Sequence, residues 1–318
     1  MRILPTLIML ARSRVARRGV IAGSVLFAIA VSILGARHFA SAGWPLAHGN
    51  APLLAAAGAI FVVAFGVKGA GWRRMFAKGE RPGSHALAAA GGAAAVTGLA
   101  LPGRFDDAVR VAVVRRFGGR AGLGAICLSV VTVGFLDAVA LTPFAAVAAG
   151  LSHSPTGIRV GLALVAGAGV GAGLVLLAAP HLGGVVRLAR FRVVRWLNTH
   201  CHSTREAGKA WLIVSLSWSL RAVALYLLLL GLGISSSFAL ALLFLSATAA
   251  STALPVAPAG AATQAGVGAA VLALAGVHVS QAIAFAVAAQ TLIAFAGAAV
   301  VVGAGAWEAR LRFAAARA

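Results

Sequence analysis

Long apolar runs, several of them near the length of a membrane-spanning helix, constrain this chain most. Of 318 residues, 61% are hydrophobic and only 10% are charged, whereas soluble domains carry about 25% charged residues. The runs lack the strict apolar–polar alternation of membrane barrel strands. Several approach the roughly 20 residues that a helix needs to cross the hydrocarbon core. We therefore expect an all-α integral membrane protein, a polytopic helical bundle.

The positive charge is confined to certain loops. A net charge of +21 comes from 27 Lys and Arg against 6 Asp and Glu. Basic residues gather at the N-terminus, after the second apolar run, between 187 and 209 and at the C-terminus, and only Arg37 and Arg159 occupy the alternate loops. Because cytoplasmic loops carry this excess, we predict a multi-pass protein of the cell (inner) membrane with both termini cytoplasmic. The basic residues then serve topology and anionic lipid headgroups rather than nucleic acid.

Six apolar runs are predicted to span the membrane, and two more are interrupted. The predicted spans are 19–36, 51–69, 121–150, 158–180, 210–232 and 278–306. A full crossing of the further segment 84–101 would place the arginines of 104–120 outside, against the charge bias. Because Gly91-Gly92 and Pro102-Gly103 disfavour a continuous helix, we expect a hairpin that re-enters from the cytoplasmic side. A full crossing of 84–101, or of the second interrupted segment 237–254, stays open.

The order of elements repeats along the chain. Each half has a span, a second span, an interrupted segment and a long span, within one membrane domain, 1–318. Repeat one covers about 19–150, a basic linker covers 181–209, and repeat two covers about 158–306. The basic loops give the halves opposite orientation, and interrupted segments at corresponding places in inverted repeats indicate a transporter with a midplane binding site. A shift of 153 residues superposes Ala100-Leu101-Pro102 on Ala253-Leu254-Pro255, Asp137 on Gln290, and Lys68 on Arg221.

Two glycine- and proline-containing motifs carry a family resemblance. The stretches "LPGRFDDAVRVAVVRRFG" and "LPVAPAGAATQAGVGAAVLALAGV", with Asp137 in the span after the first, resemble the paired motifs of the lysylphosphatidylglycerol synthase transmembrane-region family, also called flippase-like membrane proteins. The resemblance covers nearly the whole chain. It implies a membrane domain that moves a lipid or polyprenyl-linked headgroup between leaflets. In two-domain relatives a soluble aminoacyl-transferase domain follows; here the chain ends at Ala318, so we expect no synthase activity.

The chain departs from the family pattern at several positions. Phe105 and Asp106 intrude in the first motif, which leaves Asp107 in the acidic place. Val133 and Gly134 stand where an acidic–basic pair commonly precedes the aspartate. Near the second motif, Gln264 stands roughly where the family usually has an acidic residue. These changes bear on the substrate and on any ion coupling.

The first motif suggests a phosphate site. Arg104 and Arg110 are candidate ligands because a guanidinium fork suits a lipid phosphate. Asp106 or Asp107 can cap the helix that follows and lies on the same face as Arg110. These aspartates then hold the arginines in place or meet a cationic headgroup. The alternative is a capped amphipathic helix that lies on the membrane surface.

Two charged residues fall in the middle of predicted spans. Asp137 and Arg221 each cost at least about 2.5 kcal/mol at the membrane centre, so both are expected to face the protein interior. If the halves pack face to face, the two can pair with each other. The alternatives are a purely structural ion pair and a place in the substrate or coupling path. Softer candidates for a polar lining are Thr263, Gln264 and Gln290.

These observations favour transport over chemistry. With six acidic residues, no carboxylate pair or nucleophile–His–acid set is visible, and the cluster at 200–202 does not complete a metal site. We expect no enzyme activity, cofactor or metal. The expected function is flippase-like transport of an anionic phospholipid or polyprenyl-linked glycolipid. The alternatives are an accessory or scaffold protein for a separately encoded glycosyl- or aminoacyl-transferase and an integral-membrane transferase.

Overall fold

The helical prediction is confirmed by a computed structural model, which describes residues 44–100, 105–117, 119, 121–151, 155–178, 204–253 and 260–315. Within these ranges the chain forms nine α-helices and one short 3-10 helix, Pro45–His48, and no strand. The predicted span 19–36 and the candidate residue Arg104 lie outside the described residues, as does most of the predicted linker 181–209.

Five helices are long and apolar enough to cross a membrane, so the chain is a multi-pass membrane protein. They match five of the predicted spans, with differences mainly at their ends. The helix predicted at 210–232 begins earlier, at Thr204, because Glu206 in its first turn complements the helix dipole and pairs with arginines of a neighbouring loop. The five are α3 (Ala51–Arg73), α6 (Leu123–Leu151), α7 (Thr156–Ala178), α9 (Thr204–Gly231) and α12 (Val279–Ala315).

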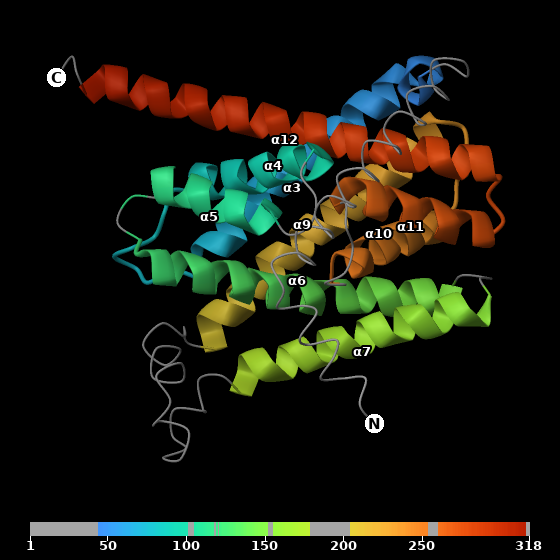
Figure 1. Cartoon of the computed structure of the whole chain (residues 1–318), viewed down its shortest axis with the longest axis horizontal. Coiled ribbons are helices and arrows are strands. Elements are labelled where there is room, and N and C mark those ends of the chain that lie inside the picture. The colour runs from blue at the N-terminus through green and yellow to red at the C-terminus, as the bar shows by residue number, and fades with distance from the viewer. Residues whose placement is uncertain are drawn as a thin grey trace, which may run out of the picture.

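Four shorter helices form two hairpins. In the first, α4 (Ser84–Ala100) packs on α5 (Phe105–Phe117), and in the second, α10 (Phe238–Ala253) packs on α11 (Gly260–Leu274). Figure 1 shows the first hairpin in the left half of the view and the second in the right half, between α12 above and α6 below. Their arms of 13 to 17 residues are shorter than the roughly 20 residues of a full span. Re-entry of these hairpins into a bilayer stays a prediction.

The two halves make corresponding contacts. In the centre, α3 and α9 pack along each other; α4 packs on α12 as α10 packs on α6, and α5 packs on α6 as α11 packs on α12. Glycine permits the closest of these approaches, since a Cβ atom added to Gly92 of α4 would lie 2.5 Å from the carbonyl oxygen of Gly297 of α12. Contacts alone do not orient the halves in a membrane, and their inverted orientation stays a prediction.

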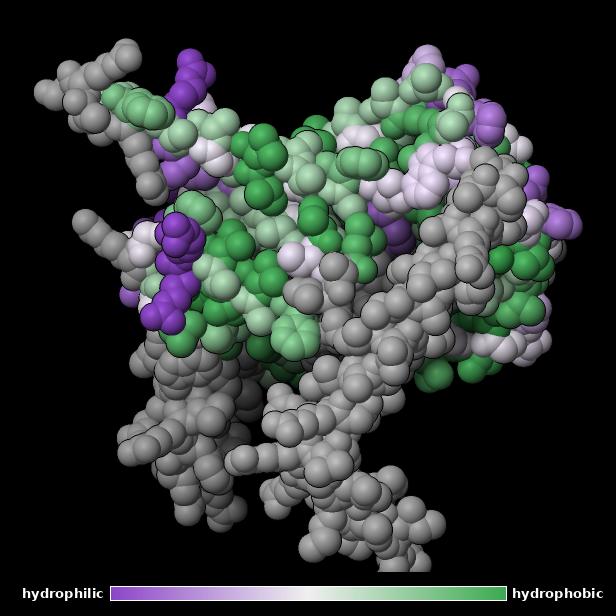
Figure 2. Space-filling view, turned by 45° about the horizontal axis from the view of Figure 1, so that its top comes forward, coloured by the Kyte–Doolittle hydropathy of each residue, from purple (hydrophilic) through white to green (hydrophobic). Residues whose placement is uncertain are grey.

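Hydrophobic side chains cover the middle of the molecule, and hydrophilic residues gather toward its two ends (Figure 2). Leu164 of α7 and Val302 of α12 expose 70% and 71% of their surface, which suits a lipid-facing belt. Glu206 joins the start of α9 to the loop after α3 through Arg74 and Arg81, each at 3.2 Å. The surface thus separates into an apolar belt and a charged rim.

Candidate functional site

An ion pair lies between α3 and α6, among the helices of the bundle. The Lys68 ammonium of α3 lies 2.7 Å from Oδ2 of Asp137 on α6, and the two side chains keep only 19% and 21% of their exposure. Trp218 of α9 donates its indole N–H to the other oxygen of Asp137, Oδ1, at 2.8 Å. Both carboxylate oxygens are therefore occupied. The sequence did not identify Lys68 as a site residue. The one signal was the shift of 153 residues, which superposes Lys68 on Arg221.

Arg221 of α9 lies beside this pair and does not share its carboxylate. Its guanidinium carbon lies 5.1 Å from the ring centroid of Phe65 and 5.1 Å from that of Trp218. Its Nε atom is buried and has no hydrogen-bond partner. Among the described residues Arg221 makes no ion pair, so the pair expected between Asp137 and Arg221 is wrong: Lys68 and Trp218 take the carboxylate instead. Aromatic faces stabilise the cation but leave its N–H donors available.

The first hairpin brings another arginine toward these cations. Arg110 of α5 pairs with Asp106 at 3.2 Å and with Asp107 at 2.5 Å, the spacing expected from one helix face. Its charge, like that of Asp137, is close enough to act on both Lys68 and Arg221. The two aspartates hold Arg110 in place, which is one of the two roles that the sequence suggested for them. The candidate cluster is Lys68, Asp137, Arg221, Arg110, Asp106 and Asp107.

The second hairpin presents neutral polar groups. Gln290 of α12 donates from Nε2 to Oε1 of Gln264 on α11 at 3.5 Å. Thr263, next to Gln264, is half-buried. These residues were predicted as polar lining, and the structure brings the two amides together on neighbouring helices. Among the described residues, no hydrogen bond or ion pair joins them to the charged cluster.

The cluster is suited to binding an anion. A phosphate could accept hydrogen bonds from the Arg221 guanidinium without breaking the Lys68–Asp137 pair, and Arg110 adds positive charge nearby. Within the described part of the chain, no group of three His, Cys, Asp or Glu side chains converges as a metal site would require. The geometry therefore supports binding of a negatively charged group among the helices.

Comparison with known proteins identifies one family. The family model described as the lysylphosphatidylglycerol synthase TM region matches residues 15–307, which confirms the resemblance carried by the two motifs. No curated protein and no solved structure matches the chain.

Proposed function

The chain belongs to the lysylphosphatidylglycerol synthase TM-region family, and on this premise we propose that it moves an anionic phospholipid or a polyprenyl-linked glycolipid between the leaflets of the cell membrane. Family membership carries a lipid-related role in the membrane. The choice of transport, and of an anionic cargo, comes from the charged cluster.

Arg221 is the observation that carries the proposal. A charged side chain within a membrane protein usually pairs or marks a path for a polar substrate, and Arg221 pairs with no described acidic residue. Two aromatic rings hold its guanidinium plane while Nε stays unpartnered. This arrangement leaves a strong phosphate donor ready for a ligand that the protein itself does not supply.

The two halves provide a means to expose this site alternately. Ser217 of α9 donates its hydroxyl to the carbonyl of Ala64 on α3 at 2.8 Å, across a separation of 153 residues. The same separation relates Phe65 to Trp218 and Lys68 to Arg221. Contacts between equivalent residues are expected where a pseudo-twofold axis passes. Such an axis supports rocking of one repeat against the other around a fixed site, with each hairpin re-entering from its own side.

The proposal also includes the orientation of the helices in the membrane and transport without a catalysed reaction. The basic ends of α3, α5 and α9 face the cytoplasm in this scheme, as the positive-inside rule requires. The carboxylates of Asp106, Asp107 and Asp137 are all engaged by cations, which disfavours their use as general acids or bases. Transport by this chain therefore needs no enzyme activity of its own.

Leaflet exchange in vesicles tests the proposal. Purified protein is reconstituted into phosphatidylcholine vesicles with a trace of fluorescent phosphatidylglycerol, and the fraction reachable by an external quencher is followed in time. We expect the protein to accelerate exchange, and Arg221→Gln to slow it about tenfold, the effect of about 1.4 kcal/mol on the barrier. Arg310→Gln, on the exposed part of α12, is the matched control and should exchange at the wild-type rate.

One result would contradict transport, and another would contradict the role of the charged cluster in it. No acceleration with phosphatidylglycerol or with a polyprenyl-phosphate sugar would favour the accessory role beside a separate transferase. Equal slowing by Arg221→Gln and Arg310→Gln would assign the effect to overall charge rather than to the cluster.

A further inference from the structure

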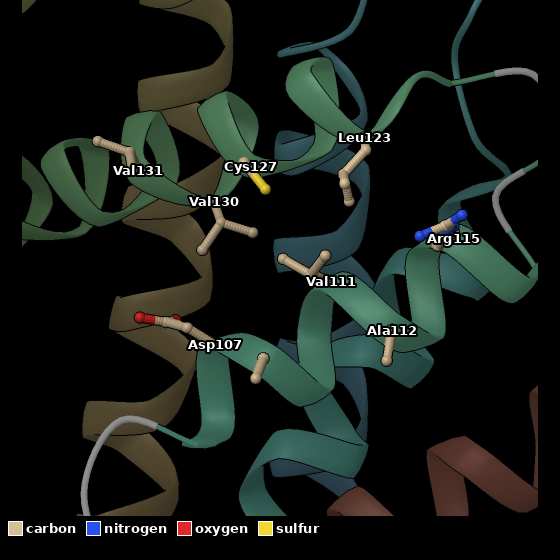
Figure 3. Close-up of a pocket in the computed structure, with 9 residues that line it drawn as sticks. Asp107, Val111, Ala112, Arg115, Leu123, Cys127, Val130 and Val131 are labelled. Carbon is tan, nitrogen blue, oxygen red and sulfur yellow. The ribbon is translucent and has the colours of Figure 1, made fainter. Parts of the chain in front are cut away.

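A groove between α5 and α6 meets the charged cluster at one end, where Asp107 lines it. It is open to the surface, has a volume of about 510 Å³ and is lined mainly by apolar side chains, among them Val111, Cys127 and Val130. Figure 3 shows these three pointing into the space between the two helices, with Asp107 toward one end and Arg115 toward the other. The volume falls within the range of ligand sites, about 300–1,000 Å³.

The two ends of the groove differ in charge compensation. Asp107 is held by Arg110, whose guanidinium also pairs with Asp106. Arg115 is exposed and forms no ion pair with any residue that the structure describes. Leu123 lies toward the Arg115 end and Val131 toward the Asp107 end (Figure 3). An occupant must therefore be apolar along its length and negative only where it meets Arg115.

The length of the groove selects the kind of occupant. The end residues Asp107 and Arg115 are eight positions apart on α5, about 12 Å at the helical rise. One leaflet of the hydrocarbon core is about 15 Å deep. If α4 and α5 re-enter from the cytoplasmic side, Arg115 lies near the headgroups and Asp107 near the midplane. A single lipid chain then fits along the groove with its phosphate at Arg115.

We propose that the α5–α6 groove binds one acyl chain of an anionic phospholipid whose phosphate contacts Arg115, beside the charged cluster. The groove is a lateral access site, where a lipid is held before its headgroup passes to the Arg221 region. The inference rests on the proposed function for this sequence of events, but occupancy of the groove is measurable without any transport.

Cys127 offers a reporter inside the groove. The chain has two cysteines, Cys127 and Cys201, and Cys127 is free and exposed, so Cys201→Ser leaves one thiol. The rate at which this thiol reacts with bromobimane is measured in detergent as dioleoylphosphatidylglycerol or dioleoylphosphatidylcholine is added. We expect phosphatidylglycerol to slow the reaction about fivefold or more, and phosphatidylcholine, with the same acyl chains, to slow it less than twofold. Inorganic phosphate alone should not protect the thiol.

Arg115 and Arg116 form a matched pair of variants. Arg115→Ala should abolish the protection by phosphatidylglycerol. Arg116 does not line the groove, and its guanidinium lies over the ring of Phe117, 5.8 Å from the centroid. Arg116→Ala should therefore keep the protection. Both residues are exposed, so neither change should disturb folding, which gel filtration and thermal unfolding verify.

Equal protection by both lipids, protection by phosphate alone, or protection that survives Arg115→Ala would overturn the inference. Its failure is distinguishable from failure of the proposed function. Asp137→Asn should strongly slow leaflet exchange yet leave Cys127 protected, whereas loss of protection with normal exchange would refute the groove alone.

Discussion

The two halves of the molecule place a short hairpin helix against a long helix in the same way, but corresponding residues of the two long helices make different contacts. On α6 in the first half, Asp137 forms an ion pair of 2.7 Å with Lys68. At the corresponding place on α12 in the second half, Gln290 makes an amide contact of 3.5 Å with Gln264. The contact of Asp137 joins two opposite charges, and the contact of Gln290 joins two neutral amides.

This difference explains why Arg221 forms no ion pair with a described residue. Lys68 and Arg221 occupy equivalent positions on α3 and α9, yet only Lys68 has an acid at its side. Because the second half carries an amide where the first carries a carboxylate, Arg221 forms no ion pair with a described residue, although the charge of Asp137 acts on it from nearby. The asymmetry thus leaves one guanidinium for a ligand. The following variants either break this difference or sharpen it.

Asp137→Asn should have the largest effect, because it leaves Lys68 without a counter-ion. Breaking a buried pair costs about 3 kcal/mol of unfolding free energy, and we expect exchange of phosphatidylglycerol to fall roughly 20-fold, about 1.8 kcal/mol on the barrier. The double variant Lys68→Met with Asp137→Leu should regain stability in thermal unfolding but not exchange. Recovery of both would make the pair purely structural.

Gln290→Glu removes the difference from the other side. The new carboxylate should compensate Arg221 and compete with a lipid phosphate, so exchange of the anionic lipid should fall about fivefold, a barrier change of about 1 kcal/mol. Gln290→Leu is the control, since it removes the amide without adding charge. If the two variants exchange lipid at the same rate, the correspondence between Gln290 and Asp137 is without functional meaning.

Gly92→Ala tests the packing that seats the first hairpin on α12. The added methyl group meets the Gly297 backbone, and overpacking of this kind costs about 1–3 kcal/mol. We expect a lower thermal unfolding midpoint and a moderate loss of exchange. Gly98 of the same helix has open space around its Cβ position, so Gly98→Ala should leave the midpoint equal or higher. A midpoint unchanged by Gly92→Ala would argue against the close approach.

Gln264→Leu should have the smallest effect. The amide contact of 3.5 Å joins neutral groups, and interhelical hydrogen bonds in membranes average about 0.6 kcal/mol. Exchange should change less than twofold in the vesicle assay. A loss as large as that of Asp137→Asn would place the neutral half in the substrate path on equal terms with the charged half.

Hydropathy and charge placement were enough to predict the five described long helices and the all-α class, because burial in lipid requires long, internally hydrogen-bonded apolar segments. They did not predict the helix 260–274 as a separate element. Its alanine and glycine composition lacks a strong period, and its ends depend on packing against α10 and α12. The predicted break at Gly91-Gly92 is wrong, because both glycines lie inside the continuous helix α4, where Gly92 packs closely on α12. The first hairpin instead has one helix that ends before Pro102-Gly103 and one that begins after it.

The sequence predicted which residues form the candidate site better than which of these residues contact one another. Asp137 and Arg221 stood out because isolated charges interrupt apolar spans. Lys68 did not, since it falls near a basic loop, and its helix continues to Arg73. The choice of Lys68 over Arg221 as partner of Asp137 depends on how α3, α6 and α9 cross, a relation among distant segments that no local pattern specifies.

Headgroup preference tests the central claim most directly, that Arg221 holds the negative charge of the lipid. The measurement is the ratio of exchange rates for phosphatidylglycerol and phosphatidylcholine, with matched acyl chains, in wild type and Arg221→Gln. The account predicts a ratio well above one in wild type that falls to about one in the variant, because only the charged headgroup loses its partner. A variant that is folded and keeps the wild-type ratio would contradict it.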